Sequence, residues 1–224
     1  MTTFVVAIAL QTSFHREERH IEGWTVKIRM ELLDKEHRDQ TESAVSLMTD
    51  QFRFIKKAVP KVAVKELQKV TIWVSPEYPN IVPRAEYHPG AEWLKENGRD
   101  SAMAKGIEIT NVRIFQAEVK RMPVFVLHEL AHAYHDRVLG FENPRIASAY
   151  EHAKASGKYD HVKRWDGKVL KAYAMTNAQE YFAEGTEAYF GTNDFYPVNR
   201  NDLKEADPEL FEILAEVWKH PKKD

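Results

Sequence analysis

The sequence has no cysteine among its 224 residues. This absence excludes disulfide bonds and thiolate metal ligands, so any metal ion must be held by histidine and carboxylate side chains. Long apolar runs are also missing from the N-terminal region. The run at residues 4–10 is far shorter than the roughly 20 residues that a membrane-spanning helix needs. We therefore expect no membrane span there.

A strong charge of either sign is also lacking. The chain has 32 Lys and Arg against 34 Asp and Glu, a formal net charge of -2 and an isoelectric point of about 6.6. This balance gives no reason to expect nucleic acid or an anionic membrane as a partner. Hydrophobic residues make up 43% of the chain, which is enough for the core of one large domain or two small lobes.

The first residues allow two interpretations. The apolar run ends in Ala7-Ile8-Ala9, a small-x-small pattern typical of the end of a secretion signal, although it also fits a first β-strand. We favour a signal remnant or N-terminal tail at residues 1–13, and hence a secreted or cell-envelope protein, with a cytoplasmic location as the alternative. Residues 14–224 then form a single domain with lobes of about 14–139 and 140–224.

The first lobe reads as a mixture of strands and helices. Loose alternation around Glu22-Gly23 predicts a hairpin over residues 14–32, and Asp34 is a plausible N-cap for a long helix that ends before Pro60. Short apolar runs at 70–74 and 106–110 predict buried strands. Four prolines between 76 and 89 predict a long ordered loop.

The second half is predominantly helical in pattern. Helices are expected at 123–138, 144–156, 177–190 and 208–218, with a β-hairpin around Asp166-Gly167. Asn177 is the expected cap of the third of these helices. Together these elements predict an α+β fold, with an N-terminal twisted sheet with helices and a mainly helical C-terminal lobe. The helix at 123–138 should lie between the two lobes, where a cleft would form.

This central helix contains the most informative motif, His128-Glu129-Leu130-Ala131-His132. Residues four apart share one helix face, so both imidazoles of the H-E-x-x-H pattern can reach one metal ion. Glu129 then lies beside the metal, where a general base is needed. Apolar neighbours predict a buried helix, and burial of these polar side chains is costly unless a metal pairs with them.

The third ligand is less obvious. A metzincin pattern would need histidine where Val138 stands, and is excluded. Glu151 has a thermolysin-like spacing, but Tyr150 and His152 do not reproduce the local signature of that family, and helix acids are usually solvated.

Helix 177–190 offers a better candidate. It carries Glu180, Glu184 and Glu187 on one side. Like charges four apart destabilise a helix unless something compensates them, and a zinc ion with its histidines would compensate Glu180 and Glu184.

The segment at residues 173–184, Y-A-M-T-N-A-Q-E-Y-F-A-E, resembles the active-site segment of metallopeptidases of the anthrax lethal factor type, which include the bacterial Pro-Pro endopeptidases. In that family a tyrosine precedes the glutamate ligand by seven residues, and a second glutamate follows four residues later. Tyr173, Glu180 and Glu184 keep these intervals. The likeness covers well under a fifth of the chain and carries no implication of kinase substrates or of Pro-Pro selectivity.

The resemblance implies a zincin-like fold and a gluzincin site. Zn²⁺ would be bound by His128, His132 and Glu180, with Glu129 as the general base. It also implies that Tyr173 stabilises the oxyanion and that Glu184 supports a ligand histidine from behind.

These expectations define an enzyme, a zinc metallopeptidase. It would hydrolyse peptide bonds in a peptide or protein substrate through a metal-activated water, with Glu129 as base. Two alternatives remain: a zinc hydrolase of a small amide or ester, and a non-catalytic, metal-stabilised binding domain. Residues 107–110 are a candidate sheet edge to which an extended peptide could add as a strand.

Overall fold

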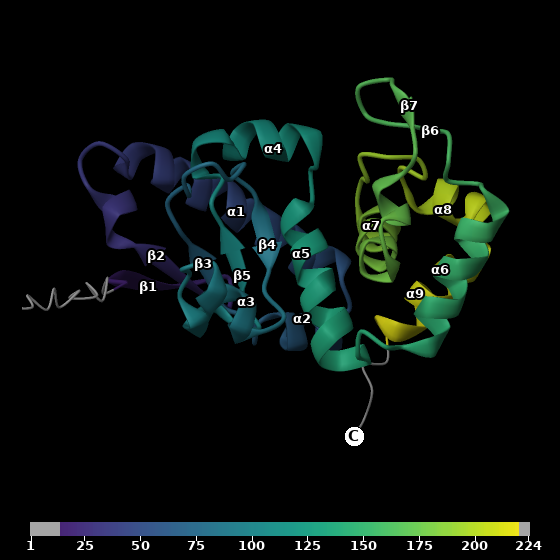
Figure 1. Ribbon diagram of the computed structural model, residues 1–224, viewed down its shortest axis with the longest axis horizontal. Coiled ribbons are helices and arrows are strands. Elements are labelled where there is room, and N and C mark those ends of the chain that lie inside the picture. The colour runs from purple at the N-terminus through teal and green to yellow at the C-terminus, as the bar shows by residue number, and fades with distance from the viewer. Residues whose placement is uncertain (1–13, 220–224) are drawn as a thin grey trace, which may run out of the picture.

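The computed structural model describes residues 14–219, so the predicted N-terminal tail lies outside the described region. The fold is α+β, with a sheet on one side and a group of helices on the other (Figure 1). The strands are β1 (Arg16–Ile21), β2 (Trp24–Arg29), β3 (Ile72–Val74), β4 (Ala85–Tyr87), β5 (Ile107–Ile109), β6 (Val162–Lys163) and β7 (Val169–Leu170). The α-helices are α1 (Arg38–Ala58), α2 (Lys61–Leu67), α3 (Ala91–Glu96), α4 (Phe115–Arg121), α5 (Phe125–Tyr134), α6 (Pro144–Ser156), α7 (Ala178–Phe190), α8 (Arg200–Ala206) and α9 (Pro208–Val217).

The main sheet is mixed, with the strand order β1-β2-β3-β5-β4. The predicted first hairpin is confirmed: β1 pairs with β2 in antiparallel register from Arg16↔Arg29 to Ile21↔Trp24. Its turn places Glu22 and Gly23 at φ 53° and 100°, a left-handed conformation that glycine adopts without strain. β2, β3 and β5 run parallel, whereas β4 closes the sheet antiparallel to β5.

The position of the sheet edge differs from the sequence prediction. β5 lies between β3 and β4, so the prediction that residues 107–110 form an open edge is wrong. The edge strand on this side of the sheet is β4, which lies in the segment predicted to be a loop. Three residues between Pro83 and Pro89 are too few to show alternation, and β4 exists because its backbone pairs with a distant strand.

The long helix begins later than expected. Asp34 does not cap it directly: its Oδ1 accepts hydrogen bonds from the backbone N–H groups of Glu36 and His37, and α1 begins at Arg38. The Asp34 side chain thus closes a turn that leads into the helix. Further along α1, Phe52 is fully buried and stacks on Trp24 of β2 with a centroid distance of 4.5 Å, which joins the helix to the sheet.

The motif helix α5 lies between the sheet and helices α6 to α9 (Figure 1). It continues as a π-helical turn from His135 to Leu139 and ends at Gly140, whose φ is 79°. α7 packs along α5 on one side and along α9 on the other. The contact with α9 is close, because a Cβ on Gly185 would lie 2.5 Å from a methyl group of Leu210. Packing of these long helices therefore fixes how the first turn of α7 faces α5.

Within residues 14–219, none of the helices combines the length and apolar character needed to cross a membrane.

Candidate metal centre

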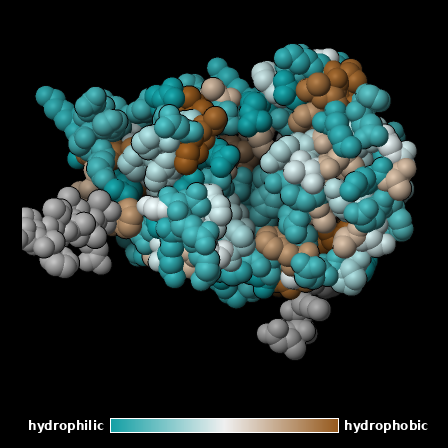
Figure 2. Space-filling model, viewed as in Figure 1, coloured by the Kyte–Doolittle hydropathy of each residue, from teal (hydrophilic) through white to brown (hydrophobic). Residues whose placement is uncertain are grey.

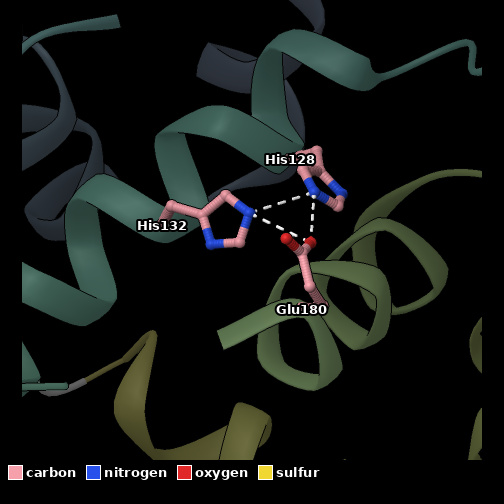
Figure 3. A group of neighbouring side chains, drawn as sticks. All are labelled: His128, His132 and Glu180. Carbon is pink, nitrogen blue, oxygen red and sulfur yellow. Dashed lines mark hydrogen bonds and ion pairs between the residues drawn. The ribbon is translucent and has the colours of Figure 1, made fainter. Parts of the chain in front are cut away.

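Three side chains from two helices converge at one point (Figure 3). The Nε2 atoms of His128 and His132 lie 3.1 Å apart, and Glu180 Oε2 lies 3.1 Å from the first and 3.2 Å from the second. Both histidines are buried, with 4% and 8% of their surface exposed. The three residues that the sequence analysis assigned to a metal are therefore brought together.

Local sequence explains half of this geometry. His128 and His132 are four residues apart in α5, so their rings project from the same face. Asn177 caps α7 as predicted, and its Oδ1 accepts a hydrogen bond from the backbone N–H of Glu180 at 2.8 Å. This cap places Glu180 in the first turn of α7, at the end nearest to the histidines.

The spacing of the three atoms fits a metal ion. Ligand atoms held tetrahedrally at 2.0–2.1 Å from zinc lie about 3.3 Å from one another. The separations of 3.1–3.2 Å observed here are close to that value. Two imidazole nitrogens and a carboxylate oxygen at this distance need a cation, or shared protons, between them. The group is thus able to hold a divalent ion.

Charge interactions within the group are strong. Burial raises the pKa of Glu180, but hydrogen bonds from His128 and His132 outweigh burial and leave this pKa well below its usual range. Glu180 is therefore ionised at neutral pH. Burial lowers the pKa of His128, whereas contacts with Glu180 and Glu187 raise it further than burial lowers it. The raised pKa of His128 reports the negative charge of the carboxylates around it, and this charge suits a cation.

Glu129 lies at the wall of the same cleft. The backbone N–H of Tyr87 donates a hydrogen bond to its Oε2 at 2.8 Å, which fixes the carboxylate. The Tyr87 hydroxyl donates a hydrogen bond to Asp136 at 2.6 Å. The backbone and the side chain of Tyr87 therefore both connect β4 to the motif helix and its π-helical turn. This role of β4 was not predicted from the sequence.

Tyr173 also reaches the group. It begins the 3-10 turn Tyr173–Met175 just before α7, and its hydroxyl lies 3.3 Å from Glu180 Oε1. Its side chain is 49% exposed at the cleft. Partial burial and the negative charge of Glu180 raise the pKa of Tyr173 to about 12, so the phenol is protonated at neutral pH and can donate a hydrogen bond.

The carboxylate behind His128 is a different residue from the one expected. Glu187 Oε1 lies 2.6 Å from His128 Nδ1, whereas Glu184 Oε1 lies 3.9 Å away, beyond hydrogen-bond distance. Burial raises the pKa of both carboxyl groups, and the hydrogen bond with His128 offsets only part of this rise at Glu187. The sequence signal for Glu187 was its spacing of seven residues from Glu180, which is two helical turns.

The alternative third ligand is not near the histidines. Glu151 is exposed on α6, and the possible metal group that contains both histidines takes Glu180 instead.

A second cluster of possible ligands, Glu86, His88 and Glu108, is formed by β4, the residue that follows it, and β5. There the guanidinium of Arg99 contacts Glu86 at 2.8 Å and Glu108 at 2.9 Å, so an arginine already supplies the positive charge.

The first metal group opens into a cleft of about 570 Å³ between the sheet and the helices, and the molecule is hollowed there along mostly hydrophilic surface (Figure 2). β4, the end of α4 and α5 line it on one side, and residues around α7 line the other. The lining residues are Arg84, Ala85, Glu86, Tyr87, Arg121, Met122, His128, Glu129, His132, Arg164, Tyr173, Glu180, Glu184, Asp194 and Phe195.

In comparisons with known proteins, no protein-family model, curated protein or solved structure matches the chain.

Proposed function

We propose that the protein is a zinc-dependent endopeptidase with a zincin-like fold. One observation carries the proposal: two histidine nitrogens from α5 and a carboxylate oxygen from α7 converge within 3.2 Å at the wall of a cleft. His128, His132 and Glu180 would hold the metal. Glu129, the residue after the first histidine, would act as the general base, the role of this glutamate in H-E-x-x-H sites.

When bound, zinc supplies a Lewis acid that polarises the scissile carbonyl and acidifies a water molecule. Glu129 accepts the proton of the attacking water and returns it to the leaving amine. Its carboxylate is oriented for this by the backbone N–H of Tyr87. Tyr173 remains protonated at neutral pH beside Glu180, so its hydroxyl can donate a hydrogen bond to the oxyanion.

The edge strand supports a peptide as substrate. The N–H of Tyr87 turns away from β5 and toward Glu129, so the open edge of β4 faces the catalytic residues. An extended peptide that pairs with this edge would lie along the cleft with its main chain near Glu129. A small amide or ester has no extended main chain to pair with such an edge. The open edge therefore favours the endopeptidase over the small-substrate hydrolase.

The proposal is tested first by substitution of the base. We expect Glu129→Gln to keep about one zinc ion per chain, measured by mass spectrometry of the metal, and to lower peptide cleavage by at least about 100-fold. A chelator added to the wild type should abolish cleavage, and added zinc should restore it. Cleavage of an ester but of no peptide would favour the small-substrate alternative, and zinc binding without any hydrolysis would favour the binding domain.

The ligand assignment is tested by a second pair of variants. Glu180→Ala removes the carboxylate that lies 3.1–3.2 Å from both histidines and should lose most of the bound zinc. Glu151→Ala removes an exposed acid from α6 and serves as the matched control. Full metal content in Glu180→Ala, with loss in Glu151→Ala, would show that the ligand has been misassigned.

A further inference from the structure

Three arginines line the cleft beside the metal group. Arg84 directly precedes the edge strand β4, Arg121 ends α4, and Arg164 directly follows β6 in the hairpin on the opposite side. The cleft thus has cationic side chains on both of its walls. Guanidinium groups recognise carboxylates by two parallel hydrogen bonds, so each of these arginines is a candidate contact for a substrate.

Arg121 is already committed to the protein. Its guanidinium contacts Glu118 at 2.7 Å and Asp194 at 3.1 Å, and Asp194 is only 5% exposed. A buried carboxylate that loses its cation is costly, so Arg121 stays where it is. Its contact with Asp194 joins α4 to the segment after α7 across the cleft. Arg121 therefore shapes the cleft and leaves substrate contacts to the other two arginines.

Arg84 can be released at little cost. Its side chain is 51% exposed and contacts Glu86 at 2.7 Å, two residues along the chain. Exposed pairs of this kind contribute little to stability. Glu86 also contacts Arg99, a buried guanidinium, at 2.8 Å. Arg99 also contacts Glu108, but it remains a cationic partner of Glu86, so Arg84 is able to turn to another carboxylate without leaving Glu86 unpaired.

Arg164 is in a similar position on the other wall. It contacts Asp166, also two residues along the chain, and its side chain is 28% exposed. Asp166 has a second cation, because Lys168 Nζ lies 3.5 Å from it. The backbone N–H of Arg164 donates a hydrogen bond to the carbonyl of Lys168, and Arg164 forms a β-bridge with Phe195. These contacts fix the position of its Cα at the wall of the cleft.

The carboxylates of the cleft have no such freedom. Among the described residues that line it, Glu86 is held by Arg99 and Asp194 by Arg121. Glu180 belongs to the metal group, Glu184 lies behind it, and Glu129, the proposed base, accepts the backbone N–H of Tyr87. A basic substrate side chain would therefore compete for acids that are already paired. An acidic group would meet two arginines whose present partners each keep another cation.

We infer that Arg84 and Arg164 form a subsite for a substrate carboxylate, so that the cleft selects peptides with an acidic group near the bond that is cleaved. The inference rests on the proposed peptidase function. The carboxylate is either an Asp or Glu side chain or the C-terminal carboxylate of a short peptide. Both sources offer the same planar pair of oxygens to a guanidinium.

Cleavage of matched peptide libraries tests this. Two libraries differ only in Glu or Gln at one fixed position, and a second pair differs only in a free or amidated C-terminus. We expect the zinc-loaded wild type to prefer one carboxylate form by roughly 10-fold or more in kcat/KM, as charge-assisted hydrogen bonds allow. The pair that shows the preference identifies the source of the carboxylate. Equal cleavage in both pairs would overturn the subsite.

Variants connect the preference to the residues. Arg84→Gln combined with Arg164→Gln should reduce the preference to within about 3-fold, mainly through a higher KM for the acidic peptide. Arg53→Gln is the matched control, because Arg53 is an exposed arginine on α1 that pairs with Glu22. A preference that survives in the double variant would overturn the assignment.

Binding separates this inference from the proposed function. Fluorescently labelled libraries bound to the zinc-loaded Glu129→Gln variant report the carboxylate preference without turnover. Preferential binding of the acidic library, in a protein whose wild type cleaves no peptide, would refute the peptidase and leave the subsite standing. Cleavage without any acidic preference would refute only the subsite, and loss of both preference and cleavage would refute both.

Discussion

Glu187→Gln should weaken zinc binding, whereas the same change at Glu184 should not. Glu187 Oε1 lies 2.6 Å from His128 Nδ1, is fully buried, and contacts the ring on the side opposite to Nε2. A carboxylate in this position fixes the imidazole with its Nε2 lone pair toward the metal and makes that nitrogen a better donor. Glutamine keeps the shape and one acceptor oxygen but removes the negative charge.

The magnitude follows from similar contacts in metal sites. Loss of such a partner usually lowers metal affinity 10- to 100-fold, or about 1.4–2.7 kcal/mol. Because glutamine retains an acceptor, we expect Glu187→Gln to fall near about 10-fold and Glu187→Ala near about 100-fold. Glu184 lies 3.9 Å from the ring, and burial raises its pKa well above the usual range, so glutamine resembles its protonated form. We expect Glu184→Gln to change affinity by less than about 3-fold.

The assay is competition for zinc with a chromophoric chelator at constant pH, with circular dichroism to check that each variant is folded. Substitution of cobalt for zinc gives a second measurement, since the absorption of the bound ion changes when the histidine ring tilts. A larger loss of affinity in Glu184→Gln than in Glu187→Gln would refute the reasoning. So would wild-type affinity in Glu187→Ala.

Three further predictions concern other parts of the molecule. His135 is fully buried, and burial lowers its pKa from 6.5 to about 4, so the unfolded chain takes up a proton first as the pH falls. The free energy of unfolding should therefore be about 2.5 kcal/mol lower at pH 4.5 than above pH 6.5. Urea unfolding of the metal-free His135→Leu variant should lack this part of the pH dependence. Ala85→Pro removes an N–H that lies on the same strand edge as that of Tyr87, and should raise KM for peptides while an ester substrate and the melting temperature stay nearly unchanged; equal KM values would show that substrate does not pair there. Phe52→Ala should destabilise the fold by about 3–5 kcal/mol in urea unfolding, because the ring is fully buried against Trp24, and a loss below about 1 kcal/mol would contradict this packing.

Much of the local structure could be predicted from the sequence. The H-E-x-x-H spacing, the Asn177 cap and the Glu22-Gly23 turn depend on contacts within a few residues, and the structure has each of them where it was expected. Such features are fixed by backbone geometry and by side chains that bond to their own neighbourhood. The late start of α1 has a local cause too, because the Asp34 carboxylate accepts the N–H groups of Glu36 and His37 in a turn that comes before the helix.

The features that the sequence did not determine all depend on partners far along the chain. β4 has only three residues and is a strand because β5 pairs with it, and it is this pairing that turns the N–H of Tyr87 toward Glu129. Glu184 and Glu187 share one side of α7, and only the packing of that helix against α5 decides which of them reaches His128. The sequence by itself determined the two histidines and their helix face. The tertiary structure decided which carboxylates surround them, because the position of one helix against another is set by side chains that pack across the whole core.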